Sequence, residues 1–214
     1  MKARLSNAGI GPGDWRRAPA IHGSELDLKR LERAGFVSRG LAPTNVGCAW
    51  SHYALWAGFV QAQRTYHLNR SMLVLEDDAI LQPGFLPSVG RLLRRCDALA
   101  FDLCSITWYR HMVPRHCVHP VAGADGRGDP PVVRLSCEHG GMVTGTAAYF
   151  ISARGAARAL ETALPMHANI DVQIGARSHQ LRWFASAKEW SMAKHDFSVR
   201  SVRVTGRAER LRQR

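Results

Sequence analysis

Residues 73–79 read Leu-Val-Leu-Glu-Asp-Asp-Ala, a short aliphatic run that ends in three consecutive carboxylates. An apolar run of this length predicts a buried strand, and Gln82-Pro83-Gly84 then breaks the chain. Like charges at such spacing repel one another, so a partner that neutralises them is expected. Hard cations such as Mg²⁺ or Mn²⁺ accept carboxylate oxygens and keep sites for water and substrate phosphates. The stretch therefore indicates a divalent-metal site; the alternative is a solvated acidic loop.

The composition is that of an ordinary globular protein, with 46% hydrophobic and 21% charged residues in a chain of 214. We predict one domain over residues 1–199, followed by a basic C-terminal tail over residues 200–214. No apolar run approaches the length of a membrane-spanning helix, and the first residues lack the apolar core of a secretory signal. These features favour a cytoplasmic protein.

The tail is strongly basic, in a chain whose formal net charge is +12. Residues 200–214 hold six arginines and one acid, Glu209. Such a segment is suited to peripheral contact with the anionic inner face of a membrane or with a phosphorylated saccharide, but it equally fits a solvated terminus. No aromatic residue follows Phe197, and stacking on bases needs aromatic rings, so we expect no nucleic-acid partner.

The five cysteines form no Cys-x-x-Cys pair, and their number is odd. We therefore predict reduced thiols, as in a cytosolic protein, rather than a set of disulfides. Two Cys-x-His segments, at residues 117–119 and 137–139, contain four potential zinc ligands. Their spacing matches no established zinc signature, so zinc is not expected there.

Hydrophobic periodicity and turn residues predict helices that alternate with strands. The expected helices cover residues 24–33, 45–66, 85–96, 153–163 and 168–179, and the expected strands 72–76, 101–106, 132–135, 143–151 and 181–186. This alternation predicts an α/β domain with a mainly parallel sheet covered by helices, whose ligands bind at the carboxyl ends of the strands. Residues 108–130, rich in Pro, Gly and His, are expected to form a long loop suited to act as a lid.

Four short motifs occur in the order found in glycosyltransferase family 25, which includes lipopolysaccharide-biosynthesis and collagen-galactosyltransferase relatives. They are Ala-Pro-Ala-Ile-His-Gly at residues 18–23, Gly-Cys-Ala-Trp-Ser-His at 47–52, the acidic strand end at 73–79, and Gly-Thr-Ala-Ala-Tyr-Phe-Ile-Ser with the following Gly-Ala at 145–156. The resemblance covers residues 17–201. It implies a GT-A-like, Rossmann-like fold and transfer, with inversion, of a hexose such as galactose. The implied donor is a nucleotide sugar, a UDP-sugar being the expected one, and the implied acceptor is a saccharide or glycolipid such as lipopolysaccharide.

The resemblance also assigns roles within the acidic strand end. It implies that Asp78 binds Mn²⁺ or Mg²⁺, while Glu76 and Asp77 face the donor ribose or bound water. A cation there would neutralise the charge that grows as the nucleotide leaves. Many GT-A enzymes add a late histidine or acid to the metal, and His195 is placed to serve; the alternative is a lone surface histidine.

Further residues have both a functional and a structural interpretation. His52 is expected to contact the donor or a neighbouring helix, and Gly145 with Thr146 to allow close approach of the sugar or simply to form a turn. Inversion requires a carboxylate that accepts the acceptor hydroxyl's proton. Asp171 is the candidate, although it equally fits a first-turn acid that stabilises the helix dipole. Asp102 is expected to be structural.

One departure concerns the amino-terminal end. Family members usually begin with an apolar strand and an Asn-Leu-x-x-x-x-x-Arg segment, whereas this chain opens inside the helix that would follow. Two explanations are open: the start codon is misplaced, or the first strand is lost, and its loss would remove a central strand and weaken donor binding. Two alternatives to a metal-dependent enzyme remain: a degenerate relative that only binds saccharide, and a basic module that binds nucleic acid or anionic surfaces.

Overall fold

The protein is described by a computed structural model, whose described residues are 1–121, 131–138, 141–187 and 193–195. The predicted tail over 200–214 and most of the Gly-rich part of the expected lid lie outside them. In these ranges the α-helices are α1 (Lys2–Asn7), α2 (Leu28–Arg33), α3 (Pro43–Thr65), α4 (Phe85–Ala98), α5 (Ala153–Ala163) and α6 (Ile170–Gly175). None of these helices combines the length and apolar character that crossing a membrane requires.

The strands form one large and one small sheet. Their bounds are β1 (Ser71–Leu75), β2 (Ala79–Leu81), β3 (Leu103–Ser105), β4 (Val118–Pro120), β5 (Val132–Leu135), β6 (Ala148–Ser152), β7 (Trp183–Ser186) and β8 (Ala193–His195). The six-stranded sheet has the order β1-β6-β3-β7-β5-β4, and β2 pairs with β8 in a separate ribbon. Within the described residues, β1 is the first strand along the chain and lies at one edge of the large sheet.

The expectation of a mainly parallel sheet is wrong. Only β3 and β7 are parallel, and the other four pairings of the large sheet are antiparallel. Two strands cause this: β6 is inserted between β1 and β3 and runs antiparallel to both, and β5 runs antiparallel to its neighbours β7 and β4. Alternating helices do return β1, β3 and β7 in one direction, but hydrophobic periodicity carries no information about which strands become neighbours.

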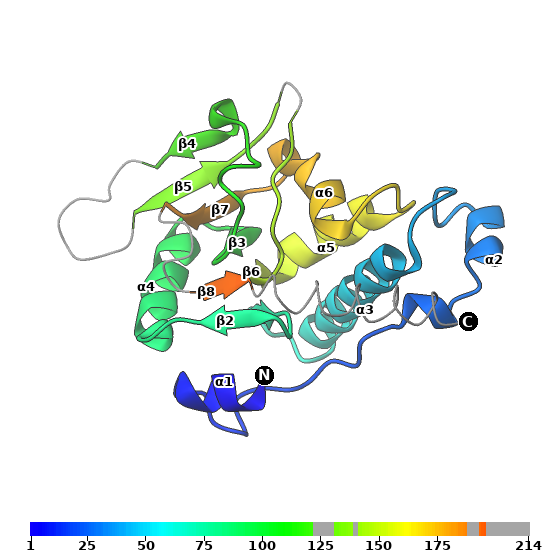
Figure 1. Cartoon of the computed structure of the whole chain (residues 1–214). Helices are drawn as coiled ribbons and strands as arrows, with labels where there is room; N and C mark the ends of the chain where they lie inside the picture. Colours follow the sequence, from blue (N-terminus) through cyan, green and yellow to red (C-terminus); the bar gives the residue numbers. More distant parts are fainter. Residues whose placement is uncertain (122–130, 139–140, 188–192, 196–214) are drawn as a thin grey trace, which may run out of the picture.

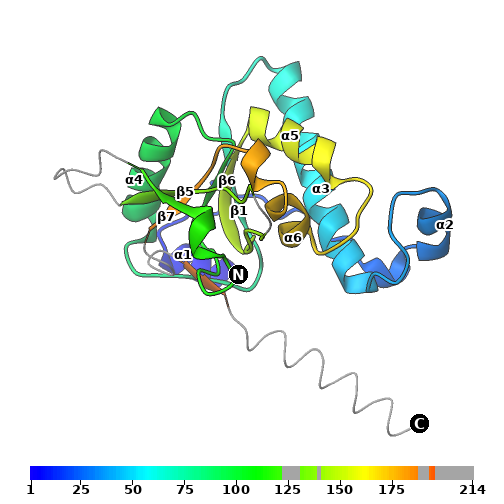
Figure 2. The ribbon, with the colours of Figure 1, turned by 90° about the horizontal axis from the view of Figure 1, so that it is seen from above.

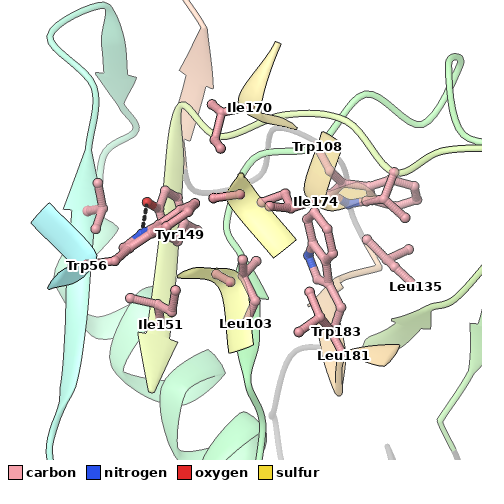
Figure 3. Close-up of a cluster of buried hydrophobic side chains, with 14 of the residues drawn as sticks. Trp56, Leu103, Trp108, Leu135, Tyr149, Ile151, Ile170, Ile174, Leu181 and Trp183 are labelled. Carbon is pink, nitrogen blue, oxygen red and sulfur yellow. Dashed lines mark hydrogen bonds between the residues drawn. The ribbon is translucent and has the colours of Figure 1, made fainter. Parts of the chain in front are cut away.

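Helices cover both faces of the large sheet, as predicted. Figure 2 shows α4 on one side of the strands and α3, α5 and α6 on the other. The strands alternate between these layers, so Tyr149 and Ile151 of β6 pack with Trp56 while Phe150 packs with Phe85. Trp108, Trp183 and Leu135 fill the centre of the first layer (Figure 3).

The starts of three helices can be compared with the caps predicted from the sequence. Ser152 caps α5 as predicted, its hydroxyl accepting a hydrogen bond from the Gly155 N–H at 3.0 Å. Helix α3 begins at Pro43, before the expected cap at residues 44–45, because a proline at the first helical position has no N–H that needs a partner. Helix α2 is capped by Asp27 rather than Ser24, through the Arg30 N–H at 3.0 Å.

Part of the expected 108–130 loop is ordered against the sheet. It contains a 3₁₀ turn at Arg115–Cys117 and the edge strand β4, which pairs with β5 (Figure 1). A three-residue strand holding a histidine and a proline has too little periodicity to be seen in a sequence. The element is therefore a folded edge of the sheet over its described part, not a bare lid.

The prediction of reduced thiols is also wrong. Disulfides join Cys96 to Cys104 and Cys117 to Cys137, which leaves Cys48 as the exposed free cysteine. Cys96 lies on α4 and Cys104 on β3, so the fold, not the sequence spacing, brings this pair together. Disulfides are typical of oxidising compartments. They weigh against the cytoplasmic location expected from the sequence.

Asp102 is structural, as predicted. Its side chain is fully buried and accepts hydrogen bonds from Arg154 Nε and Arg158 Nη1, both at 2.6 Å, and from the Arg182 N–H at 2.9 Å. Burial alone would raise the pKa of Asp102, but the Arg182 N–H and the two guanidinium groups together lower it. The carboxylate thereby ties α5 to the strands β3 and β7.

We expect Asp102→Asn to lower the free energy of unfolding at neutral pH by about 2 kcal/mol, because the arginines lose their counter-charge but remain partly hydrated. The folded-state pKa is depressed, so this contribution is present above the unfolded value of about 3.9 and is lost as pH falls through the folded pKa. Denaturant titrations at several pH values should show the two proteins converging in acid. Glu161→Gln, an exposed change on α5, is the control; equal stability of Asp102→Asn and the parent at neutral pH would contradict the assignment.

Candidate functional site

The acidic strand end lies where three strands of the large sheet meet. β1 and β3 reach their carboxyl ends at this edge, and β6 begins there because it runs antiparallel to both. The Glu76 N–H donates to the Ala147 carbonyl at 2.9 Å, and the Ile106 N–H donates to the Ala148 carbonyl at 2.9 Å. Residues that follow β1 and β3 are thereby fixed beside residues that precede β6.

The three carboxylates are not equivalent. Glu76 is half-buried, Asp77 is exposed, and Asp78 has only 8% of its surface exposed. They form a tight turn between β1 and β2, closed by the Ala79 N–H donating to the Glu76 carbonyl at 3.1 Å. The alternative of a solvated acidic loop therefore describes Asp77 but not Asp78, whose burial requires compensating interactions.

Glu76 is held from two sides through a single oxygen. Its Oε1 accepts a hydrogen bond from the Thr146 hydroxyl at 2.7 Å and lies 3.3 Å from His52 Nε2. Two residues singled out from sequence motifs, His52 and Thr146, thus both contact Glu76, although His52 lies on α3 and Thr146 two residues before β6. These bonds set the orientation of the carboxylate at the mouth of the sheet.

Behind Glu76 the contacts continue into the core. His52 Nδ1 lies 2.8 Å from the Tyr149 hydroxyl, which also accepts a hydrogen bond from Trp56 Nε1 at 2.9 Å (Figure 3). Trp56 and Tyr149 are fully buried, and His52 has 6% of its surface exposed. We refer to Trp56, Tyr149, His52 and Glu76 as the buried polar chain. In the neutral tautomer protonated on Nε2, and in the imidazolium, His52 presents an N–H to Glu76.

Sequence reasoning missed Trp56 and Tyr149 as parts of this site. Trp56 was expected only as part of the buried face of a helix, yet it lies four residues after His52 and so shares its side of α3. Tyr149 stands within the fourth motif, four residues after Gly145. Both residues could have been identified from their polar groups, because the N–H of a buried tryptophan and the hydroxyl of a buried tyrosine usually need a hydrogen-bond partner.

The charge of His52 depends on opposing effects. Burial alone would lower its pKa, since it disfavours the imidazolium. Its contacts with Tyr149, with Cys48 one helical turn away and with the Glu76 carboxylate outweigh burial and raise the pKa well above the ordinary value. These contacts favour the imidazolium form of His52 beside the Glu76 carboxylate.

The ribbon of β2 and β8 brings a distant segment to the acids. His195 of β8 is the register partner of Ala79, the residue after Asp78. The predicted metal ligand His195 is thus adjacent to the acidic turn in its backbone position, while its side chain lies outside the described part of the structure. A pairing across more than 110 residues could not be read from the sequence.

The donor set can be compared with the needs of a divalent cation. In the described ranges no group of three or more His, Cys, Asp or Glu side chains is arranged to hold a metal ion. Magnesium in phosphate-binding sites is commonly held by one or two carboxylates, with the other positions taken by water and phosphate. Asp77 and Asp78 supply two such carboxylates in one turn, so the residues present fit this mode of binding.

Asp171 lies next to the same turn of chain as Thr146. It stands in the first turn of α6, and its Oδ2 accepts a hydrogen bond from the Gly145 N–H at 3.2 Å. Gly145 has a φ of +111°, a conformation that side chains rarely adopt, so a glycine is required for this N–H to face Asp171. Both predicted roles, the base and the first-turn acid, are compatible with this position.

The first motif and the part of the second motif before His52 serve the fold. A Cβ on Gly23 would collide with the Pro43 carbonyl, and one on Gly47 would collide with the backbone of Gly23. The Ser51 hydroxyl donates to the Gly47 carbonyl at 2.7 Å and accepts from the Ile21 N–H at 2.9 Å. These contacts bind the turn before α2 to α3, the helix that presents His52.

The comparisons with known proteins all match one protein family. The family model described as "Glycosyltransferase family 25 (LPS biosynthesis protein)" matches residues 22–174. A protein named "Glycosyltransferase 25 family member" from Drosophila pseudoobscura pseudoobscura is 26% identical over 187 residues, which cover 80% of this chain and 27% of that protein. One of the same name from Drosophila melanogaster is 28% identical over 153 residues, covering 66% of this chain and 22% of that protein. The chain thus spans about a quarter of the length of the curated relatives that it matches.

We expect the His52 imidazole to titrate above 6.5, the ordinary value, in histidine-selective NMR spectra, with His52→Gln used to assign its signal. Because the folded-state pKa is raised, the stability that charged His52 contributes is present below 6.5 and is lost as pH rises through the folded pKa. The stability difference between His52→Gln and the parent should accordingly shrink in alkaline solution. A titration midpoint below 6.5 would mean that burial dominates and that the contacts with Glu76 are weaker than described.

Proposed function

Since the chain belongs to glycosyltransferase family 25, we propose that it transfers a hexose from a nucleotide sugar to a hydroxyl group of a saccharide or glycolipid. The observation that carries this proposal is the orientation of Glu76 by His52 and Thr146 at the start of the acidic turn. Fixed carboxylates at the carboxyl end of a strand suit the binding of a cation that in turn binds the donor diphosphate. The expected donor is a UDP-sugar, with galactose as the expected hexose.

The architecture supports a GT-A-like assignment. A mixed sheet is covered by helices on both faces, and the acidic turn follows the edge strand β1 of that sheet. The matched family range, residues 22–174, contains the buried polar chain, the acidic turn and Asp171 but ends before His195. The contribution of His195 therefore rests on its pairing opposite Ala79 alone.

Asp78, with Asp77 and His195, is the proposed holder of Mn²⁺ or Mg²⁺. When bound, such a cation would supply positive charge that stabilises the leaving nucleotide diphosphate. We assign Glu76, which is oriented by its bonds to His52 and Thr146, to the donor ribose or to an ordered water. In its imidazolium form, which the Glu76 carboxylate favours, His52 would offset the negative charge gathered in the turn.

Asp171 is the proposed base for transfer with inversion. Its carboxylate would accept the proton of the acceptor hydroxyl as the oxygen of that hydroxyl bonds to the anomeric carbon. The bond from the anomeric carbon to the phosphate oxygen breaks on the opposite side, and the electron pair leaves with the nucleotide. The Gly145 N–H fixes the Asp171 side chain for this step, and the neighbouring Thr146 connects it to Glu76. Two consecutive residues, Gly145 and Thr146, thereby connect the proposed base Asp171 to the donor-binding residue Glu76.

The alternatives from other classes receive no specific support. The basic module was inferred from the tail, which lies outside the described residues. The degenerate relative that only binds saccharide differs from the enzyme in donor turnover, which the experiment on Asp78 measures. The cytoplasmic location is not carried into the proposal, because the two disulfides favour an oxidising compartment. Contact with a membrane surface was inferred from the tail, which lies outside the described residues.

Asp78→Asn should remove metal-dependent donor turnover, with a loss of about 100-fold or more, because the amide is a much weaker ligand of a hard cation. A panel of nucleotide sugars is first screened for thermal stabilisation with and without Mn²⁺, which reports binding independently of catalysis. The same variant should lose the Mn²⁺-dependent part of that stabilisation. Asp14→Asn, an exposed carboxylate in an N-terminal turn, is the matched control. Full turnover by Asp78→Asn would exclude the metal assignment.

Asp171→Asn is expected to slow sugar transfer by roughly 10²- to 10⁴-fold, the usual contribution of a positioned general base. The amide oxygen of the variant retains an acceptor for the Gly145 N–H, so the fold and nucleotide-sugar binding should persist. Product formation and nucleotide-dependent thermal stabilisation are measured on the same samples, with Glu161→Gln as the control. Unchanged transfer would leave Asp171 with only its role at the start of α6.

A further inference from the structure

A second group of side chains lies near Gly145 and has no role in the proposed donor site. Residues 109–112, Tyr-Arg-His-Met, follow β3 at the edge of the sheet where Glu76 lies. Met112 is 54% exposed and Met142 is 38% exposed, and they are two of the five large apolar side chains exposed in the described part of the chain. Exposed apolar side chains beside a candidate active site indicate a surface that a ligand covers.

Tyr109 is packed directly against the residue that holds Asp171. Its Cδ2 lies 3.3 Å from the position that a Cβ on Gly145 would occupy, and its N–H donates to the Thr144 carbonyl at 3.3 Å. Gly145 in turn donates its N–H to Asp171. The aromatic ring and the proposed base are therefore both in contact with this one glycine, whereas the next residue, Thr146, contacts Glu76.

The segment is held in place by several contacts. The Val113 N–H donates to the Tyr109 carbonyl at 3.2 Å, which closes a turn after the aromatic residue. Gly141, with a φ of +106°, lies so close to Pro114 that a Cβ would stand 2.9 Å from its ring. The disulfide of Cys117 joins the end of the segment to the chain that leads into Met142. Such a surface is preformed rather than assembled on binding.

The chemistry of these side chains matches that of a sugar ring. A pyranose presents an apolar face of C–H groups and a rim of hydroxyl groups. The half-buried Tyr109 ring, with His111 edge-on to it at a centroid distance of 6.2 Å, offers an aromatic surface for the apolar face. The exposed Arg110 and His111 supply hydrogen-bonding groups for the hydroxyl rim.

We propose that Tyr109, His111, Met112 and Met142 form the subsite that binds the acceptor saccharide. The proposal rests on the proposed function, because it requires that the hydroxyl group to be deprotonated lies at Asp171. A base must touch the acceptor, and Tyr109 reaches the base through Gly145, so a sugar ring stacked on Tyr109 directs a hydroxyl group toward Asp171. The other occupant to be considered is the base of the donor nucleotide, which also stacks on aromatic rings.

The test measures binding of defined monosaccharide probes by saturation-transfer NMR on the full chain. The probes are methyl β-D-galactopyranoside, methyl β-D-glucopyranoside and methyl α-D-mannopyranoside at millimolar concentration, each with UDP and Mn²⁺ present to fill the donor site. We expect at least one glycoside to bind, Tyr109→Ala to weaken that binding about tenfold, and Tyr109→Phe to retain it. Tyr66→Ala, which removes a 70% exposed tyrosine at the end of α3, is the matched control and should bind as the parent does.

Three outcomes would contradict the proposed subsite. They are failure of all three glycosides to bind, equal binding to Tyr109→Ala and the parent, and displacement of the bound glycoside by excess UDP. Loss of UDP binding in Tyr109→Ala would assign the ring to the nucleotide base instead. Circular dichroism and thermal melts of every variant separate unfolding from loss of a contact, and Tyr109→Phe tests the ring if Tyr109→Ala is unstable. Donor hydrolysis by the unmodified chain is measured separately, so failure of the proposed function is distinguished from failure of the subsite.

Discussion

The antiparallel insertion of β6 between β1 and β3 is the constraint on which the site depends. It places the amino end of β6 beside the carboxyl ends of its neighbours, so Thr146 meets Glu76 without any long loop. The same strand then turns Tyr149 into the layer of α3, where it contacts His52 and Trp56. Thr146, just before β6, therefore contacts the Glu76 carboxylate, and Tyr149 within β6 contacts His52, the histidine that holds this carboxylate. A parallel neighbour in its place would present the opposite end of a strand to Glu76.

Two buried acids illustrate the difference between stabilising a fold and forming a site. Asp102 is surrounded by two guanidinium groups and a backbone N–H, which satisfy both of its oxygens and depress its pKa. Glu76 instead takes its bonds from a hydroxyl group and a histidine whose charge depends on its surroundings. Arginines keep their charge at every physiological pH, whereas an imidazole can gain or lose its proton as its surroundings change. The second arrangement suits a site that gains and loses a charged ligand.

The four motifs separate into two physical classes once they are placed in space. Gly23, Gly47 and Ser51 allow two segments of backbone to touch, and Gly155 does the same against the Asp102 carbonyl. Glu76, Gly145 and Thr146 lie together at the edge of the sheet. A motif in a sequence does not distinguish these classes, because close backbone packing and ligand contact both restrict a position to one or two residue types. Their order and spacing were enough to indicate the family, which the comparisons then showed.

The sequence by itself determined the elements whose signals are local: the cap at Ser152, the strand that ends in three acids, the buried length of α3 and the covered sheet. Those features follow from hydrogen bonding within a few residues and from hydrophobic periodicity. Only the tertiary structure decided the strand order, the two disulfides, the pairing of His195 with Ala79 and the contact of Tyr149 with His52. Each of these joins residues far apart in the chain, and such contacts are set by the packing of whole layers, which periodicity does not encode.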